Sequence, residues 1–177
     1  MIDIKQIQAE YYKCAIDKTR VYMISHFLKT YDMTVQKDVI FNLFPRQIDY
    51  LNALNEHTNN ITTKPRQAGI TTVTAAKLAC EVVLSDASSP LTILIVGNTR
   101  DLAKLMLSKI KTFLEDLPRW FWGDEYWSPD KDDPKNIKKI FKVNNQFELK
   151  LFNGCQLYAR GSGKETTRGV SSVSWLV

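Results

Sequence analysis

The chain has 177 residues, of which 44% are hydrophobic and 24% charged, ordinary values for one globular domain with a sizeable core. These values exclude a disordered tail, a collagen-like chain and a disulfide miniprotein. The 24 Lys and Arg exceed the 19 Asp and Glu by 5, a net charge that slightly favours polyanionic partners. The three cysteines lie far apart and only two histidines occur, which disfavours zinc and disulfides. No apolar run approaches the roughly 18 residues of a membrane span.

The first part of the chain has the pattern of helices. Apolar residues recur at helical spacing across residues 3–31, which predicts two helices. Residues 33–44 are rich in β-branched and aromatic side chains, so we expect them to be extended. Pro45 suits the first turn of a third helix, which we expect to run to about His57. The residues expected on its buried face are Ile48, Leu51 and Leu54.

Beyond these helices the pattern changes to alternating strands and helices. Residues 61–63 predict a short strand, and a helix is expected over residues 71–84. Residues 91–97 are a continuous apolar run typical of a strand buried on both faces, and Asn98 or Thr99 is expected to cap the next helix. This order predicts a parallel α/β sheet. In the helix expected after residues 91–97, the residues expected to face inward are Leu102, Leu105, Met106, Ile110 and Phe113.

The last third of the chain predicts antiparallel strands. Residues 120–136 combine aromatic, acidic and proline residues and indicate an irregular surface excursion. Residues 138–160 have the pattern of three short strands joined by turns at Asn144-Asn145 and Asn153-Gly154. Residues 172–177 form a further apolar strand. Because a buried strand is an unusual natural terminus, we expect the chain to be a piece of a longer protein.

The segment KPRQAGITT, residues 64–72, has the pattern of a phosphate-binding loop. A strand, a tight glycine loop and hydroxyls at a helix start place backbone N–H groups around an anion, and a hydroxyl there can ligate magnesium. The standard pattern GxxxxGK[ST] fails twice, because Lys64 replaces its first glycine and Ile70 its lysine. We predict that Lys64 substitutes for the lysine and that Thr71 ligates magnesium.

Two other interpretations of these glycine-containing loops stay open on local sequence alone. Residues 64–72 could be an ordinary strand–loop–helix turn with a surface lysine and arginine. The segment GSGKETT, residues 161–167, also contains Gly-Lys, but it lacks the preceding glycine and indicates a polar loop.

Together with their neighbours, these residues give the chain a family resemblance. It resembles, over most of its length, the N-terminal ATPase part of the large terminase subunit of tailed bacteriophages, the motor that packages DNA into proheads. The segments that carry the resemblance are 14–31, like the opening helices; 44–47 with Leu51, like the adenine-reading segment; Arg66-Gln67-Ala68-Gly69 with Thr71-Thr72, like the RQxG phosphate loop; 91–106, like the second strand and its helix; and Thr167-Arg168-Gly169, which precede the strand leading to Walker B.

The resemblance implies a P-loop NTPase fold of the RecA/ASCE type, with ATP and Mg²⁺ as cofactors. Arg66 is then expected to reach the γ-phosphate in cis, and Arg168 to act on a neighbouring subunit's nucleotide in trans, since phosphoryl transfer depends on neutralising charge. For both arginines a surface position or a structural ion pair is the alternative. The nucleotide-binding residues implied are Gln47, Lys64, Arg66, Gln67, Ala68, Gly69, Ile70, Thr71 and Thr72.

The resemblance also implies a domain organisation and partners. Residues 1–44 would be a helical lead or lid, and residues 45–177 a partial P-loop ATPase domain without the Walker B carboxylates or the nuclease domain. The expected partners are double-stranded viral DNA, a portal protein and a small terminase subunit, in a homo-oligomeric ring. We expect the protein in the host cytoplasm, away from membranes, with weak hydrolysis by these residues alone.

The sequence departs from the family at two of these motifs. Most members carry lysine at the place of Ile70, and an aromatic residue commonly stands at the place of Arg46. A non-catalytic split or remnant subunit that binds motor partners is therefore one alternative function. A helicase-type P-loop ATPase, which shares the glutamine segment, is another.

Overall fold

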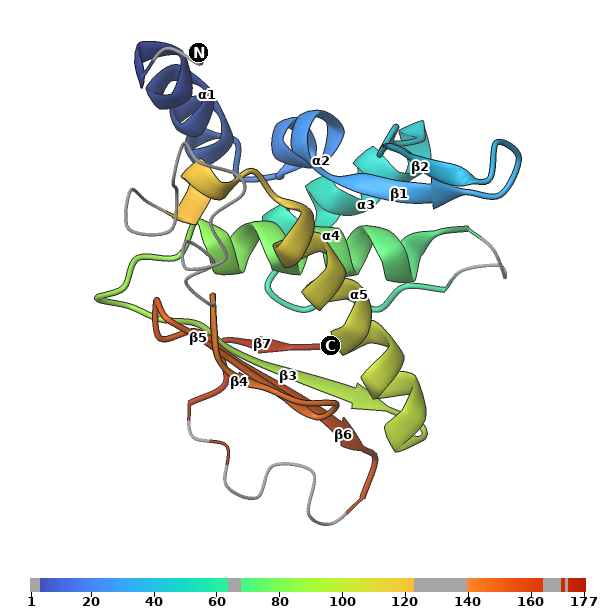
Figure 1. Cartoon of the computed structure of the whole chain (residues 1–177). Helices are drawn as coiled ribbons and strands as arrows, with labels where there is room; N and C mark the ends of the chain where they lie inside the picture. The colour runs from blue at the N-terminus through green and yellow to red at the C-terminus, as the bar shows by residue number, and fades with distance from the viewer. Residues whose placement is uncertain (1–3, 64–67, 123–139, 164–169, 171) are drawn as a thin grey trace.

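The structure is a computed structural model that describes residues 4–63, 68–122, 140–163, 170 and 172–177 (Figure 1). Its helices are α1 (Ile4–Ile16), α2 (Val21–Phe27), α3 (Pro45–Glu56), α4 (Ile70–Val83), α5 (Arg100–Asp116) and the 3₁₀ turn η1 (Arg119–Trp122). Its strands are β1 (Lys29–Asp32), β2 (Lys37–Ile40), β3 (Thr92–Gly97), β4 (Phe141–Asn144), β5 (Glu148–Leu151), β6 (Gln156–Gly161) and β7 (Trp175–Leu176).

Five of the strands form a mixed sheet in the order β4-β5-β6-β3-β7. Strand β3 is parallel to both β6 and β7, whereas β5 is antiparallel to β4 and β6. The α/β prediction is therefore confirmed, but a mostly parallel sheet is wrong. The reason is the length of the connections: the short turns after β4 and β5 can join only antiparallel strands.

The core lies between the sheet and helices α4 and α5, which Figure 1 shows on one side of it. Ile93 and Ile95 of β3 belong to this core together with most of α4, whose residues from Val73 to Val83 are almost all buried. Small and β-branched side chains make α4 thin enough to pack against α5 on one side and α3 on another. The start of α4 is thereby held in a fixed position above the sheet.

Helix α5 begins as predicted, and most of its predicted buried face is confirmed. Thr99 is its N-cap, and its hydroxyl accepts a hydrogen bond from the backbone N–H of Leu102 at 3.3 Å. Met106, Ile110 and Phe113 are buried as predicted, whereas Leu102 and Leu105 are 55% and 62% exposed. Periodicity alone does not fix the edges of the buried stripe, and packing on β3 and β6 places Ala103 and Leu107 inward instead. The buried residues of α5 are Ala103, Met106, Leu107, Ile110, Phe113 and Leu114.

Two other predictions near the N-terminal half are corrected. The second helix ends at Phe27, and residues 29–32, partly predicted helical, form strand β1, which pairs with β2 in a hairpin. Residues 61–63 form no strand, and Ile61 is fully exposed. An exposed three-residue segment gains neither burial nor ladder hydrogen bonds, so its β-branched residues do not suffice. None of the described helices is both long and apolar enough to cross a bilayer.

A buried cluster of charges joins the N-terminal helices to α4. The Arg20 guanidinium pairs with Glu81 at 2.9 Å, and the Lys77 ammonium pairs with the same carboxylate at 3.1 Å. Lys77 is 2% exposed and also donates to the backbone oxygen of Lys18. Burial alone would raise the pKa of Glu81, but the hydrogen bonds and charges of Arg20 and Lys77 outweigh it and lower that pKa.

Candidate functional site

The start of α4 has the backbone geometry of an anion site. Gly69 is the residue before the helix and adopts a left-handed conformation, with φ of 72°. Its carbonyl accepts hydrogen bonds from the N–H groups of Thr72 and Val73, at 2.9 and 3.0 Å. The N–H groups of Ile70 and Thr71 have no partner among the described residues, as expected for a first helical turn. The N–H groups of a first helical turn can bind an anion at the positive end of the helix.

Glycine at position 69 is required by the fold as well as by the predicted chemistry. A Cβ atom there would lie 2.7 Å from Nε2 of Gln47, closer than real Cβ contacts, and the positive φ strains any other residue. The glycine thus allows the loop to pass close to α3.

Gln47 holds the loop against α3. Its side chain is buried; Oε1 accepts from the N–H of Phe44 at 3.0 Å, and Nε2 donates to the oxygen of Ala68 at 3.2 Å. The first bond is half of a capping box, since Gln47 is the third residue of α3. The structure thus places two of the predicted nucleotide-binding residues, Gln47 and Ala68, in contact. Adenine recognition by Gln47 stays a prediction, because both polar atoms of its amide already bind the chain.

A second contact between α3 and α4 fixes the same region. The hydroxyl of Tyr50 is hydrogen-bonded to the hydroxyl of Thr74 at 2.8 Å, and Thr74 also donates to the backbone oxygen of Ile70 at 2.8 Å. The first turn of α4 is therefore held from outside by one amide and one phenol. A site on such a turn would be rigid before a ligand binds.

The two threonines of the predicted motif differ in their surroundings. Thr71 is exposed at the helix start, where a hydroxyl could bind a cation that accompanies phosphates. Thr72 is half-buried and accepts a hydrogen bond from the ammonium of Lys109 at 3.3 Å. Lys109 comes from the middle of α5, so the sequence motif did not include it. The signal that could have found it is an exposed lysine on the helix predicted beside α4.

Several predicted site residues lie outside the described residues. These are Lys64, Arg66, Gln67 and Arg168. The substitution of Lys64 for a lysine at position 70, and the roles of the two arginines, therefore stay predictions. Ile70, which stands at that position, is half-buried in the first turn of α4.

Among the described residues, few side chains near α4 are suited to hold a metal ion. No group of three or more His, Cys, Asp or Glu side chains with metal-binding geometry occurs in the part of the chain that is described. The Thr71 hydroxyl fits a magnesium ion that is bound mainly by phosphates, since magnesium in such sites keeps water ligands and needs few protein oxygens.

Strand β7, at one edge of the sheet, places the C-terminal segment beside β3. Val177 donates its N–H to Leu94 at 2.9 Å and accepts from Val96, which extends the parallel pairing of β7 with β3. The Lys77 ammonium of α4 lies 5.8 Å from the ring centre of Trp175 in β7. Figure 1 shows α4 starting on the side toward which β3 points. Ligands of open α/β sheets bind at the carboxyl ends of the strands.

Comparison with known proteins adds no family assignment. No protein-family model matches the chain, and no curated protein sequence is detectably similar to it. Any function proposed for the chain therefore depends on its residues and on the geometry described above.

Proposed function

We propose that this chain is a P-loop-type nucleotide-binding domain that binds ATP with Mg²⁺, and that it forms the ATPase part of a DNA-packaging motor of the terminase type. The observation that carries the proposal is the start of α4. There, left-handed Gly69 ends the RQAG sequence, and the first-turn N–H groups of Ile70 and Thr71 follow it together with the Thr71 hydroxyl. Few other functions require a glycine loop, a helix start and hydroxyls in this order.

In this proposal each residue near α4 has a separate task. The N–H groups of Ile70 and Thr71 bind phosphate oxygens, and the Thr71 hydroxyl binds the accompanying magnesium ion. Lys109 adds positive charge beside Thr72. Gln47 keeps the loop in place through Ala68, so that the N–H groups point at the ligand without reorganisation on binding.

Lys64 and Arg66 complete the proposed site. Lys64 supplies the ammonium that Ile70 cannot, and Arg66 neutralises charge on the γ-phosphate in cis. Arg168 is proposed to act in trans on the nucleotide of the next subunit in a ring. The DNA substrate, the portal protein and the small terminase subunit are the partners that the family resemblance supports.

Calorimetric titration with ATP tests the nucleotide site. We expect saturable binding in the presence of Mg²⁺, strongly weakened by Lys64→Ala, and a loss of magnesium dependence in Thr71→Ala. Lys37→Ala changes an exposed lysine on strand β2 and serves as the control of equal charge. Failure of the unaltered protein to bind Mg-ATP would contradict the proposal.

A further inference from the structure

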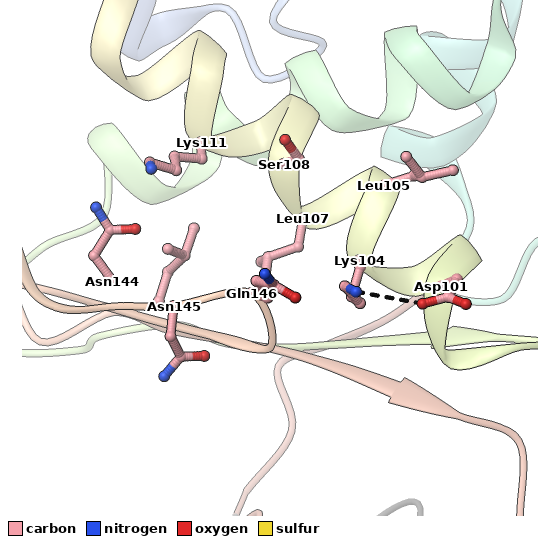
Figure 2. A pocket seen from close by; sticks show the side chains of 10 residues that line it. Asp101, Lys104, Leu105, Leu107, Ser108, Lys111, Asn144, Asn145 and Gln146 are labelled. Atoms are coloured by element: carbon pink, nitrogen blue, oxygen red, sulfur yellow. Dashed lines mark hydrogen bonds and ion pairs between the residues drawn. The ribbon is translucent and has the colours of Figure 1, made fainter.

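A cavity of about 580 Å³ lies between α5 and the turn that joins β4 to β5 (Figure 2). Its volume is within the range of pockets that hold small ligands or one or two units of a polymer. Leu107 of α5 and Leu149 of β5 contribute apolar surface, whereas lysines, the carboxylate of Asp101, a serine and side-chain amides contribute polar groups. Such a mixture of apolar surface and separated polar groups is typical of a site that recognises a defined chemical pattern.

The two walls of the cavity are fixed to each other before any ligand binds. The centre of the Phe147 ring in the turn lies 3.5 Å from the guanidinium of Arg100 and 5.3 Å from the ammonium of Lys104, both on α5. Within the turn, Oδ1 of Asn145 accepts hydrogen bonds from the N–H groups of Phe147 and Glu148, at 2.8 and 2.9 Å. The hairpin therefore holds its position against the helix.

Two lysines stand along the helical wall at a spacing suited to a polyanion. Lys104 and Lys111 both line the cavity and are seven residues apart, about 10.5 Å along the helix at 1.5 Å per residue. A nucleic-acid strand carries one phosphate for about every 3.4 Å of helix axis. The backbone spacing of the two lysines thus corresponds to phosphates about three nucleotides apart.

The carboxylates near these lysines do not block such binding. Lys104 pairs with Asp101 at 3.3 Å, and Lys111 pairs with Glu115 at 3.7 Å. Both carboxylates are well exposed, at 84% and 49% for their side chains, and exposed ion pairs of this kind contribute little. A phosphate oxygen can therefore replace either carboxylate at little cost.

Uncharged polar side chains complete the cavity. Those of Ser108, Asn144 and Gln146 line it, and none of the three makes a hydrogen bond to another of the described residues. Figure 2 shows Asn144 and Lys111 facing each other from opposite walls. Side-chain amides match the paired donors and acceptors at the edge of a nucleobase, while lysines match phosphates.

We propose that this cavity binds a phosphodiester strand of nucleic acid, with phosphates on Lys104 and Lys111 and a base edge or sugar against the amides of Asn144 and Gln146. This proposal rests on the proposed function in one respect: a packaging motor must contact DNA. It assigns the contact to a surface that is separate from the start of α4. Binding of nucleotide and binding of the strand can therefore be measured independently.

Fluorescence anisotropy with labelled oligonucleotides in the absence of ATP tests the proposal, with one duplex probe and one single-stranded probe. The variant is Lys104→Gln with Lys111→Gln, which keeps the aliphatic stems. We expect its affinity at low salt to fall by about tenfold or more. The slope of log K against log salt should decrease by about 1.8 for the duplex, because two lysines no longer neutralise phosphates. The probe that shows this change identifies the form of strand that the cavity takes.

The matched control is Lys13→Gln with Lys37→Gln, which removes the same charge elsewhere. Lys13 has the same surroundings as Lys104, an i,i+3 carboxylate and an aromatic ring, Tyr22, at 5.7 Å. A second variant, Asn144→Ala with Gln146→Ala, is expected to weaken binding without changing the salt slope. The proposal is overturned if the Lys104 and Lys111 variant, folded by circular dichroism, binds both probes like the control variant. It is equally overturned if poly-glutamate binds the cavity and neither oligonucleotide does.

Discussion

Single residues at the start of α4 contribute through backbone shape more than through their side chains. Gly69 combines a left-handed φ of 72° with a close approach to Gln47. We expect Gly69→Ala to lower the free energy of unfolding by about 1–3 kcal/mol, because alanine is strained in this conformation and its Cβ displaces the Gln47 amide. Urea denaturation measures the change. Gly163→Ala, where a Cβ has open space, is the control and should have little effect.

Lys109 tests whether a charged side chain contributes to the proposed phosphate site at the start of α4. If the phosphate site lies at the start of α4, Lys109→Gln should weaken Mg-ATP binding about threefold to tenfold, because an ammonium beside Thr72 is removed. Lys111→Gln, two residues along the same helix and paired with Glu115, is the control. Equal ATP affinities of the two variants in calorimetry would argue against a contribution from Lys109.

At the scale of elements, the contact of the N-terminal helices with α4 depends on one carboxylate. Glu81→Gln leaves the ammonium of Lys77 and the guanidinium of Arg20 buried without their counter-charge. We expect a loss of about 3–5 kcal/mol in the free energy of unfolding, the usual result of removing one partner of a buried ion pair. Glu115→Gln breaks an exposed pair of α5 and should change stability far less. Similar losses in both variants, measured by urea denaturation, would refute a special role for Glu81.

The same carboxylate predicts a pH dependence. Despite burial, Arg20 and Lys77 lower the pKa of Glu81 below its ordinary value of 4.5. A carboxyl group whose pKa is lower in the folded than in the unfolded state stabilises the folded protein. This stabilisation is complete above the pKa of the unfolded state and is lost as the pH falls through the pKa of the folded state. The stability difference between the unaltered protein and Glu81→Gln should therefore be constant near neutral pH and shrink below about pH 4.5. Urea denaturation across this range measures it, and a difference that stays constant into acid contradicts the assignment.

At the scale of the whole molecule, residues 1–44 share a core with the rest. Cys14, Met23, Ile24 and Leu28 are buried in one cluster with residues of α4, β3 and α5. We expect a single cooperative unfolding transition, with far-UV and near-UV circular dichroism coinciding. Deletion of residues 1–44 should expose the apolar surface of α4 and Lys77 with it, and abolish cooperative folding. A truncated protein that unfolds cooperatively would show instead that the lead is an independent lid.

The sequence predicted much of the local structure of the chain. Pro45 predicts the start of α3, the Thr99 hydroxyl caps α5, and the turn at Asn153-Gly154 joins β5 to β6. These features depend on residues within a few positions of one another, so periodicity, caps and turn residues suffice to predict them. The glycine turn before α4 is also a local feature, and the sequence pattern of residues 64–72 predicts it at Gly69.

The contacts between distant segments were decided by the tertiary structure. Periodicity predicted the burial of Met106, Ile110 and Phe113 in α5, but only packing on β3 and β6 placed Leu102 and Leu105 outward. The approach of Lys109 to Thr72 spans 37 positions, and the cavity joins α5 to a turn more than 30 residues away. By itself the sequence determined most of the helices and the turns between the last strands. Only the packed chain decided which lysines and amides stand together, because burial of one helix face determines where every other side chain of that helix points.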